Sequence, residues 1–469
     1  MIIPNTYFDT AQITLISIGA FFFLISLVSH TVNKGKFTFI SLGLTALFVF
    51  SFAALLDPFL NMWDERFHAL VAKNLMNHPL LPTLYDDPVV NMAYDRWDKY
   101  HIWLHKQPLF LWQIALSFKI FGISEFSLRI PSLILGTILV LITYRCGKLV
   151  ANDRVGYIAS VLLISSIFII ELIGGWQTGE HNDVAFIVYV SLSIWSFIEY
   201  YYSKNLKWIY LIGLFSGMAI LCKWLVGFLV YFGWMILKIL QRKNRPWFYK
   251  DIIWSLIVTI IIALPWQIFT FIKYPEEASN AYRLNALHFT IPIDGHGGNF
   301  WYHFDKLSIL YGTIAYFLIL PGMFFLVKRS KDKNLIFSLL SMVIVVYLFF
   351  SFAATKMPSF TLVVIIPILV SLASFWDYLL EYFTKLLKKK TLVKLIFIVS
   401  IIAALLYRFD IEYLQEKHTF WKETNTYSRS MVFNKKVYQS LDLPNGTVIF
   451  NQKNSSRLCL GVKRKVKKT

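Results

Sequence analysis

The chain has 469 residues, of which 57% are hydrophobic and 17% are aromatic, and its mean hydropathy is +0.56. Soluble domains are about 45–50% apolar, so this composition excludes an ordinary soluble protein and predicts a multi-pass membrane protein. The formal net charge of +19 does not indicate nucleic-acid binding, because the excess of Lys and Arg lies in short turns between apolar runs and near the C-terminus. That placement is typical of membrane topology and of contact with the headgroups of membrane lipids. The three cysteines are far apart and form no CxxC pair, which indicates packing residues and neither a disulfide nor a thiolate metal site.

The hydrophobic pattern predicts an all-α polytopic fold with about 12 transmembrane helices, since crossing a bilayer takes roughly 20 apolar residues. The predicted spans are 11–30, 37–56, 128–146, 155–173, 184–203, 207–222, 224–240, 251–272, 305–327, 334–352, 359–377 and 391–407. We divide the chain into an extra N-terminal span with its turn (1–36), a membrane-embedded module (37–409) and a small, basic, soluble tail (410–469). A strand-like run in the tail, 447–450, follows an Asn-Gly turn.

The apolar segment 107–122 decides the topology, because it is short for a span and contains Lys119. If it lies along the membrane as an interfacial helix, the basic turns all share one face; these are residues 33–36, 145–154, 204–207, 242–250, 328–333 and 385–390. Positively charged turns collect in the cytoplasm, so we expect this arrangement. The polar segments 57–106 and 273–304 then face away from the cytoplasm, together with Asp183 and Lys356.

An acid-rich island, residues 57–106, interrupts the apolar background. Its acids are Asp57, Asp64, Glu65, Asp86, Asp87, Asp95 and Asp98. Apolar residues at helical spacing predict a short surface helix that starts near Asp64; they are Phe67, Leu70, Val71 and Leu75. Asp64 is therefore either a helix-capping acid or a general base or metal ligand, and the residue types leave these alternatives open. The island ends at Lys106, a cation of the kind that binds phosphate.

Three further positions carry polar chemistry on the same predicted face. Asp183 stands just before a span, where a carboxylate is costly unless it is paired or used, although it could instead cap that helix. His296 lies in a glycine-rich loop whose backbone permits close approach to a ligand, although a lone histidine is more often incidental. Lys356 stands at the outer end of a span, where it either pairs with phosphate or extends to the lipid headgroups.

Several short motifs recur in a specific order between residues 37 and 380. They are Asp64-Glu65, Lys106-Gln107-Pro108-Leu109, Phe121-Gly122-Ile123-Ser124-Glu125 through Arg129-Ile130-Pro131-Ser132, Asn182-Asp183, Leu264-Pro265-Trp266, Gly295-His296-Gly297 before Phe300-Trp301-Tyr302, and Lys356-Met357-Pro358-Ser359. In this order they resemble the membrane glycosyltransferases of the C superfamily. The resemblance is closest to the bacterial branch related to protein O-mannosyltransferases and to the aminoarabinose transferase of lipid A.

The resemblance implies an inverting glycosyltransferase of the bacterial inner membrane. It would move a hexosyl or pentosyl group from a polyprenyl-phosphate-linked sugar to a lipid, polysaccharide or protein acceptor on the non-cytoplasmic, periplasmic face. The resemblance assigns catalysis to Asp64 and Asp183, with Asp64 as the base. It assigns substrate binding to Glu65, Lys106, Arg129, His296 and Lys356.

Two further expectations concern cofactors and an alternative function. A divalent metal ion would have Asp64 and His296 as candidate ligands, and no nucleotide cofactor is expected. The chain departs from the family at His105, where the family usually has Glu, and it has one proline after Lys106 where two are usual. A transporter or flippase of lipid-linked glycans is the alternative, but it would place charges along the spans, whereas here the acids gather on one face.

Overall fold

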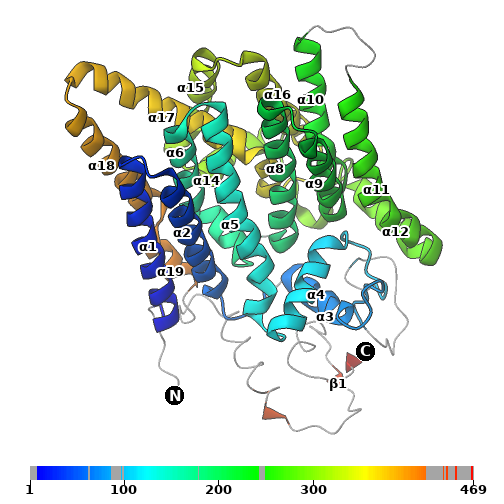
Figure 1. Ribbon diagram of the computed structural model, residues 1–469. Coiled ribbons are helices and arrows are strands. Elements are labelled where there is room, and N and C mark those ends of the chain that lie inside the picture. The colour runs from blue at the N-terminus through cyan, green and yellow to red at the C-terminus, as the bar shows by residue number, and fades with distance from the viewer. Residues whose placement is uncertain are drawn as a thin grey trace.

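The computed structural model describes residues 8–61, 64–85, 97, 100–177, 179–241 and 249–418, and in the tail residues 437, 440, 441, 449, 450, 466 and 467. Helices dominate this part of the chain (Figure 1). The first half contains α1 (Thr10–Thr31), α2 (Gly35–Leu55), α3 (Asp64–Leu75), α4 (Leu109–Phe121), α5 (Glu125–Val150), α6 (Asp153–Ile164), α7 (Ile167–Ile173), α8 (Glu180–Ser203), α9 (Lys207–Lys223), η2 (Trp224–Phe228) and α10 (Leu229–Leu240). The second half contains α11 (Lys250–Lys273), α12 (Pro275–Leu287), η4 (Ile293–Gly295), α13 (Tyr302–Asp305), α14 (Leu307–Tyr311), α15 (Thr313–Arg329), α16 (Lys333–Phe352), η5 (Pro358–Val364), α17 (Ile365–Leu387), α18 (Lys390–Arg408) and α19 (Ile411–His418).

The predicted tail is described at few positions beyond residue 418. Two strands of two residues each, β1 (Ile449–Phe450) and β2 (Val466–Lys467), pair in parallel there. Residues 447 and 448 of the predicted strand-like run, and Asp86, Asp87, Asp95 and Asp98 of the acid-rich island, lie outside the described residues.

The predicted all-α membrane fold is confirmed, but the count of 12 spans is not. Within the described residues, nine helical stretches are long and apolar enough to cross a membrane, or up to 11 if two bent pairs each form one span. One bent pair is α6 with α7, at 58°, and the other is Tyr302–Tyr311 with α15, at 105°. The predicted spans 207–222 and 224–240 fall in one helical stretch, Lys207–Leu240, which is counted once.

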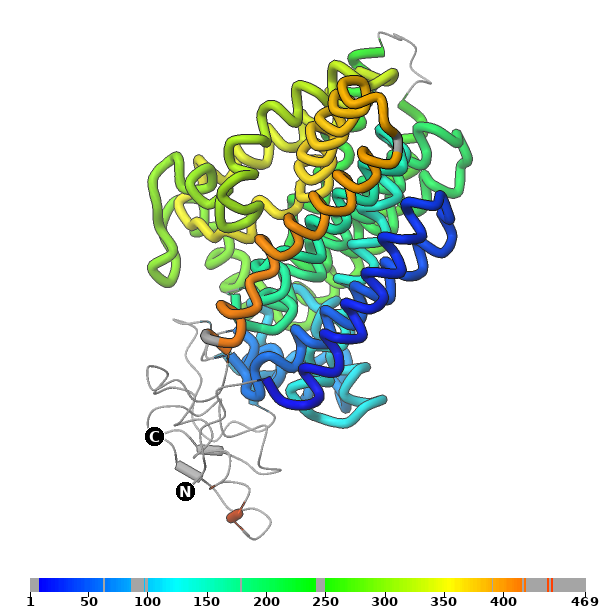
Figure 2. The backbone as a smooth tube through the Cα atoms, turned by 90° about the vertical axis from the view of Figure 1, so that its left-hand side faces the viewer, coloured from blue at the N-terminus to red at the C-terminus, as the bar shows by residue number. Residues whose placement is uncertain are grey.

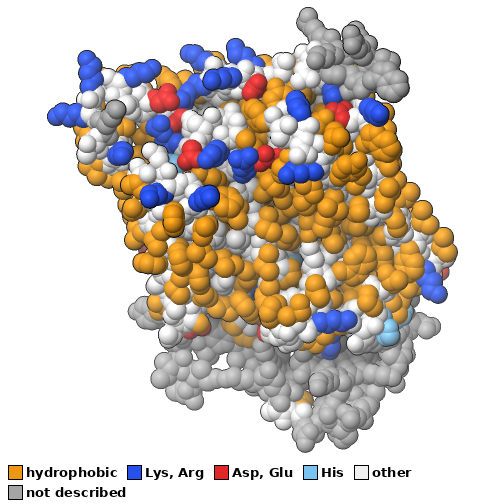
Figure 3. Space-filling model, viewed as in Figure 1, with side chains coloured by type: hydrophobic (Ala, Val, Ile, Leu, Met, Phe, Trp, Pro, Cys, Tyr) orange, Lys and Arg blue, Asp and Glu red, His pale blue; other side chains and the backbone are white. Residues whose placement is uncertain are grey.

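One end of the helical bundle is rich in Lys and Arg. Lys and Arg side chains crowd the end at the top of Figures 1 and 3, where α5 passes into α6 and α15 into α16. At the opposite end, α3 packs against α4, and α4 packs against α5 (Figure 1). α4 is an apolar helix of 13 residues, too short to count as a span. It therefore lies at the end of the bundle, as predicted for residues 107–122.

Local sequence signals account for where the helices near this end begin. α5 starts with a capping box, in which the Ser124 hydroxyl accepts from the Ser127 backbone nitrogen at 3.1 Å and the Ser127 hydroxyl accepts from that of Ser124 at 2.9 Å. α3 starts at Asp64, as predicted, and its apolar stripe is buried. An acid in the first turn interacts favourably with the helix dipole.

α8 runs through the centre of the bundle, and most of its side chains are buried (Figure 1). It packs on α9, and α9 packs closely on α11 because of two glycines. A Cβ atom on Gly213 would lie 2.4 Å from the Ser255 carbonyl oxygen, and one on Gly217 would lie 2.6 Å from Ile262. Small residues allow such close approach of helix backbones in membranes. α18 runs along the outside of the bundle towards the end where α3 and α4 lie (Figure 2).

Candidate active site

Asp64 and Lys106 form an ion pair at the end of the bundle that carries α3 and α4. Lys106 Nζ lies 3.3 Å from an Asp64 carboxylate oxygen, and the two side chains are 19% and 18% exposed. Burial by itself would raise the pKa of Asp64, but its neighbours, Lys106 foremost, together outweigh burial and hold that pKa below its ordinary value. Asp64 is therefore an ionised carboxylate that solvent reaches and that has its own cation.

Glu65 points the other way, into the interior, and is fully buried. Its carboxylate accepts two hydrogen bonds from Arg129, from Nε at 2.7 Å and from Nη2 at 3.1 Å. His181 Nε2 lies 3.0 Å from the same carboxylate, and the Asn61 backbone nitrogen donates to it at 2.6 Å. Burial raises the pKa of Glu65, but Arg129 and His181 outweigh burial and lower the pKa to about 2.

Arg129 uses all of its hydrogen-bond donors inside the chain. Besides the two bonds to Glu65, Nη1 donates to the carbonyls of Ala54, at 3.0 Å, and Asp57, and Nη2 donates to that of Phe59 at 2.8 Å. A guanidinium group has five N–H donors, and these contacts account for all of them. Glu65 and Arg129 thus fasten the segment after α2 to α5, and this geometry does not support the prediction that they bind the substrate.

Asp183 lies in the first turn of α8 with 2% of its surface exposed. Lys223 Nζ, at the end of α9, lies 2.5 Å from Asp183 Oδ1, and the Ser359 hydroxyl in η5 donates to Oδ2 at 2.5 Å. Gly179 has a φ of +93°, and a Cβ atom there would lie 2.2 Å from Asp183 Oδ2, so position 179 requires glycine on both counts. Asp183 is therefore a paired acid that joins three helices, and its catalytic role stays a prediction.

Lys223 is not among the site residues predicted from the sequence. The chain turns back directly after it, since a Cβ atom on Gly227 would lie 2.9 Å from the Ile220 backbone nitrogen. Burial and the charges of Lys106 and Lys223 lower the pKa of His288 to about 4. The available sequence signal was a lysine standing between two apolar runs.

The glycine-rich loop that carries His296 is fastened to the segment before η5. The Thr355 backbone nitrogen donates to the His288 carbonyl at 2.9 Å, and that of Lys356 donates to the His296 carbonyl at 2.9 Å. Asp294 in the same loop accepts a hydrogen bond at 3.0 Å from Trp97 Nε1, in the acid-rich island. The structure thus brings the half-buried His296 to the same end as the island, and its role in binding stays a prediction.

Lys356 is 3% exposed, and its ammonium group caps the C-terminus of α16. Nζ donates to the carbonyls of Ser351 at 2.7 Å, Ala353 at 2.8 Å and Phe350 at 3.1 Å. These contacts use all three ammonium donors and satisfy carbonyls that the end of a helix leaves unpaired. The geometry therefore supports neither of the two predictions, contact with phosphate or extension to the headgroups.

The described residues do not fit a resident divalent metal ion. Among them, no group of three or more His, Cys, Asp and Glu side chains is arranged to hold one. Of the two expected ligands, Asp64 is paired with Lys106, and His296 lies in the glycine-rich loop. His105, at the position where the family has Glu, stacks its ring on Trp97 at 4.8 Å between centroids.

Two fully buried groups lie close to Asp64 without hydrogen-bond partners in the described part of the chain. One is the imidazole of His68, which lies one turn after Asp64 on α3, and the other is the carboxylate of Glu180. Neither ring nitrogen and neither carboxylate oxygen has a partner there. His68 Nδ1 lies 3.9 Å from Glu180 Oε2. Burial lowers the pKa of His68 to about 3, so the imidazole is neutral at pH 7. Glu180 has a φ of +40°, which is uncommon for a residue with a side chain. Such unpaired and strained groups cluster at functional sites.

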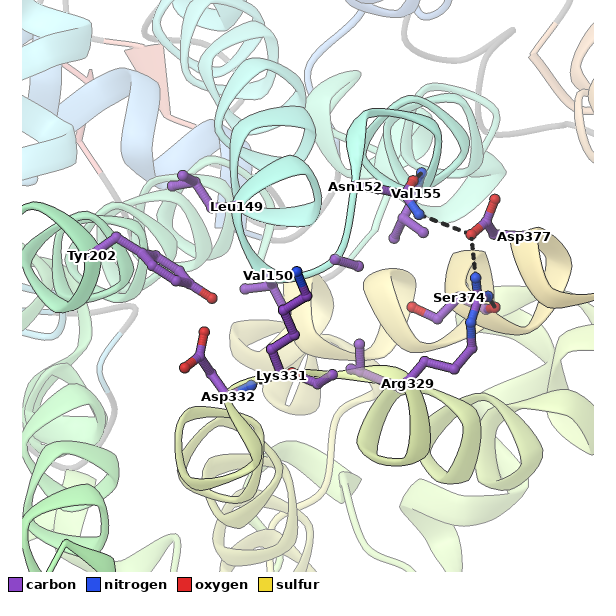
Figure 4. Close-up of a pocket in the computed structure, with 13 residues that line it drawn as sticks. Leu149, Val150, Asn152, Val155, Tyr202, Arg329, Lys331, Asp332, Ser374 and Asp377 are labelled. Carbon is purple, nitrogen blue, oxygen red and sulfur yellow. Dashed lines mark hydrogen bonds and ion pairs between the residues drawn. The ribbon is translucent and has the colours of Figure 1, made fainter. Parts of the chain in front are cut away.

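A separate cavity of about 290 Å³ lies at the opposite, basic end (Figure 4). Asp377 is buried at its edge and accepts hydrogen bonds from Asn152 Nδ2 at 2.9 Å and Arg329 Nη2 at 3.1 Å. Arg154 Nε lies 3.0 Å from the same carboxylate. These contacts hold α6, α15 and α17 together, far from the acids of α3 and of the first turn of α8.

Known proteins resemble this chain in sequence and in fold. A family model described as dolichyl-phosphate-mannose-protein mannosyltransferase matches residues 105–269. An uncharacterised protein from Aquifex aeolicus is 25% identical over 305 residues, which cover 63% of this chain and 56% of the relative. The undecaprenyl phosphate-alpha-4-amino-4-deoxy-L-arabinose arabinosyl transferase 1 of Pseudomonas fluorescens is 26% identical over 269 residues, covering 55% of this chain and 47% of that protein. The chain thus matches about half the length of these curated relatives.

Solved structures share the fold. The crystal structure of ArnT from Cupriavidus metallidurans bound to undecaprenyl phosphate aligns with a TM-score of 0.68 and 14% identity, covering 92% of this chain and 85% of that one. The archaeal oligosaccharyltransferase AglB from Archaeoglobus fulgidus aligns with a TM-score of 0.59 and 13% identity, covering 92% of this chain and 64% of that one. The chain therefore has the fold of ArnT and AglB, which agrees with the resemblance drawn from the order of its motifs.

Proposed function

We propose that this protein transfers a sugar from a polyprenyl-phosphate carrier to an acceptor at the non-cytoplasmic face of the membrane, with inversion at the sugar carbon. The observation that carries the proposal is the partly exposed Asp64–Lys106 pair, at 3.3 Å, in a chain with the C-superfamily fold. It joins a carboxylate that can accept a proton to a cation that can bind a phosphate. The ArnT structure bound to undecaprenyl phosphate supports a carrier of this class.

The mechanism requires a base on one side of the sugar carbon and a phosphate on the other. The acceptor O–H or N–H attacks that carbon, the carbon–oxygen bond to phosphate breaks, and Asp64 takes the proton. Lys106 stabilises the negative charge that develops on the departing phosphate. When Lys106 turns to the phosphate it leaves Asp64, which then becomes a stronger base because its neutralising charge has moved away.

Lys223 supplies a second cation for the phosphate. Its side chain is 28% exposed although it pairs with Asp183, and together with Lys106 it lowers the pKa of His288. A polyprenyl phosphate would therefore meet two lysines. In this proposal Asp183 positions the Lys223 ammonium group and does not transfer a proton.

The charge of one end of the bundle supports the proposed orientation. The Lys- and Arg-rich end in Figure 3 would face the cytoplasm by the positive-inside rule, and the end with Asp64 would then face the exterior or periplasm. A donor whose lipid tail stays in the bilayer would then present its phosphate near α3 and α4.

The test is sugar transfer by the purified protein in liposomes, with undecaprenyl-phosphate-linked aminoarabinose and mannose as the two donors offered. We expect release of undecaprenyl phosphate with one of them when membrane glycolipids or envelope proteins from cells lacking the protein are added. Mass spectrometry of those acceptors, compared with material from unmodified cells, identifies the product. Movement of the lipid-linked sugar between leaflets without release of undecaprenyl phosphate would contradict the proposal and support a flippase.

A further inference from the structure

The C-terminal helix α19 reaches the loop that precedes α8. Asp410 caps α19, since its side chain accepts from the Tyr413 backbone nitrogen at 2.8 Å. Just before it, at the end of α18, Arg408 donates to Ser165 Oγ at 3.2 Å and to the Leu162 carbonyl at 3.2 Å. These bonds fasten the end of α18 to the C-terminal end of α6, just before α19 begins. We had predicted that residues 410–469 form a small soluble tail.

Glu171, on α7, contacts three side chains of α19. It is 2% exposed, and Lys417 Nζ lies 2.6 Å from its Oε1. His418 Nε2 also lies 3.2 Å from Oε1, and the Tyr413 hydroxyl donates to that atom at 3.2 Å. On the other side Gln177 donates to Oε2 at 2.5 Å. Four side chains therefore surround one buried carboxylate, and three of them come from α19.

α19 also packs on the ring of Trp176 in this loop. The His418 ring meets the Trp176 ring edge-to-face at 4.7 Å between centroids, and Lys417 Nζ lies 5.5 Å from the centre of the same ring. The Trp176 backbone nitrogen donates to the Glu171 carbonyl at 2.8 Å. The loop contacts Glu171 through its backbone and α19 contacts Glu171 through its side chains, so both are fixed to this one residue.

The loop in turn packs against Glu65, the neighbour of Asp64, and against Asp183. A Cβ atom on Gly175 would lie 2.2 Å from a Glu65 carboxylate oxygen, and one on Gly179 would lie 2.2 Å from an Asp183 carboxylate oxygen. The Trp176 carbonyl accepts from Asn61 Nδ2 at 3.2 Å, just before α3. A shift of this loop would therefore move the start of α3, which carries Asp64, and the start of α8 together.

We propose that α19 is a positioning clamp for the active site: by holding Glu171, its residues Tyr413, Lys417 and His418 fix the loop that seats α3 and α8. The inference rests on the proposed function for its effect on catalysis, but not for its effect on the loop. In this proposal the three residues act through Glu171 and the loop, so their contribution appears in the alignment of the reacting groups.

The test uses Lys417→Gln and Glu171→Gln in the full-length protein in nanodiscs, with Glu199→Gln as the matched control. Glu199 accepts two hydrogen bonds from Arg145, from Nε at 2.5 Å and Nη2 at 3.1 Å, at the opposite end of the bundle. Hydrogen exchange measured by mass spectrometry should rise over residues 172–183 and 57–68 in both clamp variants, and over neither segment in the control. The double variant should add little to either single one, because the two residues act through one contact.

The kinetic readout separates positioning from binding. We expect kcat for sugar transfer to fall by about 10- to 100-fold in the clamp variants, with the KM for the undecaprenyl-phosphate donor within about threefold of normal, because small misplacements of reacting groups cost rate. Exchange that stays unchanged over 172–183, or rises equally in the control, would overturn the clamp. Faster exchange with unchanged kcat would overturn its catalytic part. If the unmodified protein transfers no sugar, the proposed function fails, whereas the exchange experiment still decides the clamp.

Discussion

Replacing Lys106 with Gln tests whether one cation serves both the base and the phosphate. Two unit charges 3.3 Å apart attract by about 5 kcal/mol at an effective dielectric constant of about 20. Both side chains are about a fifth exposed, so solvent screens this attraction, and a hydrogen bond to a charged group contributes about 1.5–3 kcal/mol net. A phosphate held by the same ammonium group should lose a similar amount. We therefore expect the Kd for undecaprenyl phosphate to rise about 10- to 100-fold.

The same substitution should change the pKa of Asp64 with a defined sign. Burial favours the neutral acid and Lys106 favours the carboxylate, so removing the lysine raises the pKa. In the unmodified protein the depressed pKa contributes stability above the unfolded value of about 4, and this is lost as the pH falls through the folded pKa. In Lys106→Gln the free energy of unfolding should therefore fall less between neutral and acid pH than in the unmodified protein. The pH below which the transfer rate falls should be higher, because Asp64 becomes protonated at a higher pH.

The assays are tryptophan-fluorescence titration of undecaprenyl phosphate into nanodiscs and thermal unfolding between pH 3 and 8. Lys119→Gln is the control, because Lys119 is an exposed lysine on α4 at the same end of the bundle. An unchanged Kd in Lys106→Gln, or an equal increase in Lys119→Gln, would refute the assignment of the phosphate to Lys106.

Three other substitutions test the framework around the site. Arg129→Gln should lower the free energy of unfolding by about 3–5 kcal/mol, because it leaves the buried Glu65 carboxylate unpaired; a normal melting temperature combined with lost binding of undecaprenyl phosphate would restore Arg129 as a substrate ligand. Lys356→Met should cost about 1–3 kcal/mol through three freed carbonyls and leave the Kd for undecaprenyl phosphate unchanged, as measured by thermal unfolding and by the same titration. Cysteine at position 120, where Ile120 is 63% exposed, should react with an impermeant maleimide from outside the cell, and reaction from the cytoplasmic side alone would overturn the topology.

The helical fold and the place of α3 and α4 were predictable because they depend on local patterns. The apolar stripe after Asp64 has helical periodicity, and burial of one face follows from that periodicity. Segment 107–122 is short for a span, and the single face shared by the basic turns decided the prediction that it does not cross. The number of spans was less predictable, because bends such as the 58° break between α6 and α7 leave the apolar composition unchanged.

The partners of the charged residues were not predictable from residue type. Lys106, Lys223 and Lys356 all stand near the ends of apolar helices, yet the first two remain partly exposed beside acids whereas the third caps α16. Arg129 matched a motif, but its guanidinium donates to carbonyls at the end of α2 and in the segment that follows it. These differences are decided by packing between segments that are far apart in the chain. Motif order therefore indicates candidate residues along the chain, but it does not indicate which partner each of them contacts.

The most direct test of the central claim is sugar transfer by Asp64→Asn in liposomes. The asparagine keeps the shape of the side chain and removes its ability to accept a proton. Asp251→Asn is the control, because Asp251 pairs with Lys238 at 2.8 Å away from the site. We predict a loss of about 10²- to 10⁴-fold in the transfer rate for Asp64→Asn, the range that a general base contributes, with undecaprenyl phosphate still bound. Transfer by Asp64→Asn at the rate of the unmodified protein would contradict the assignment of Asp64 as the base.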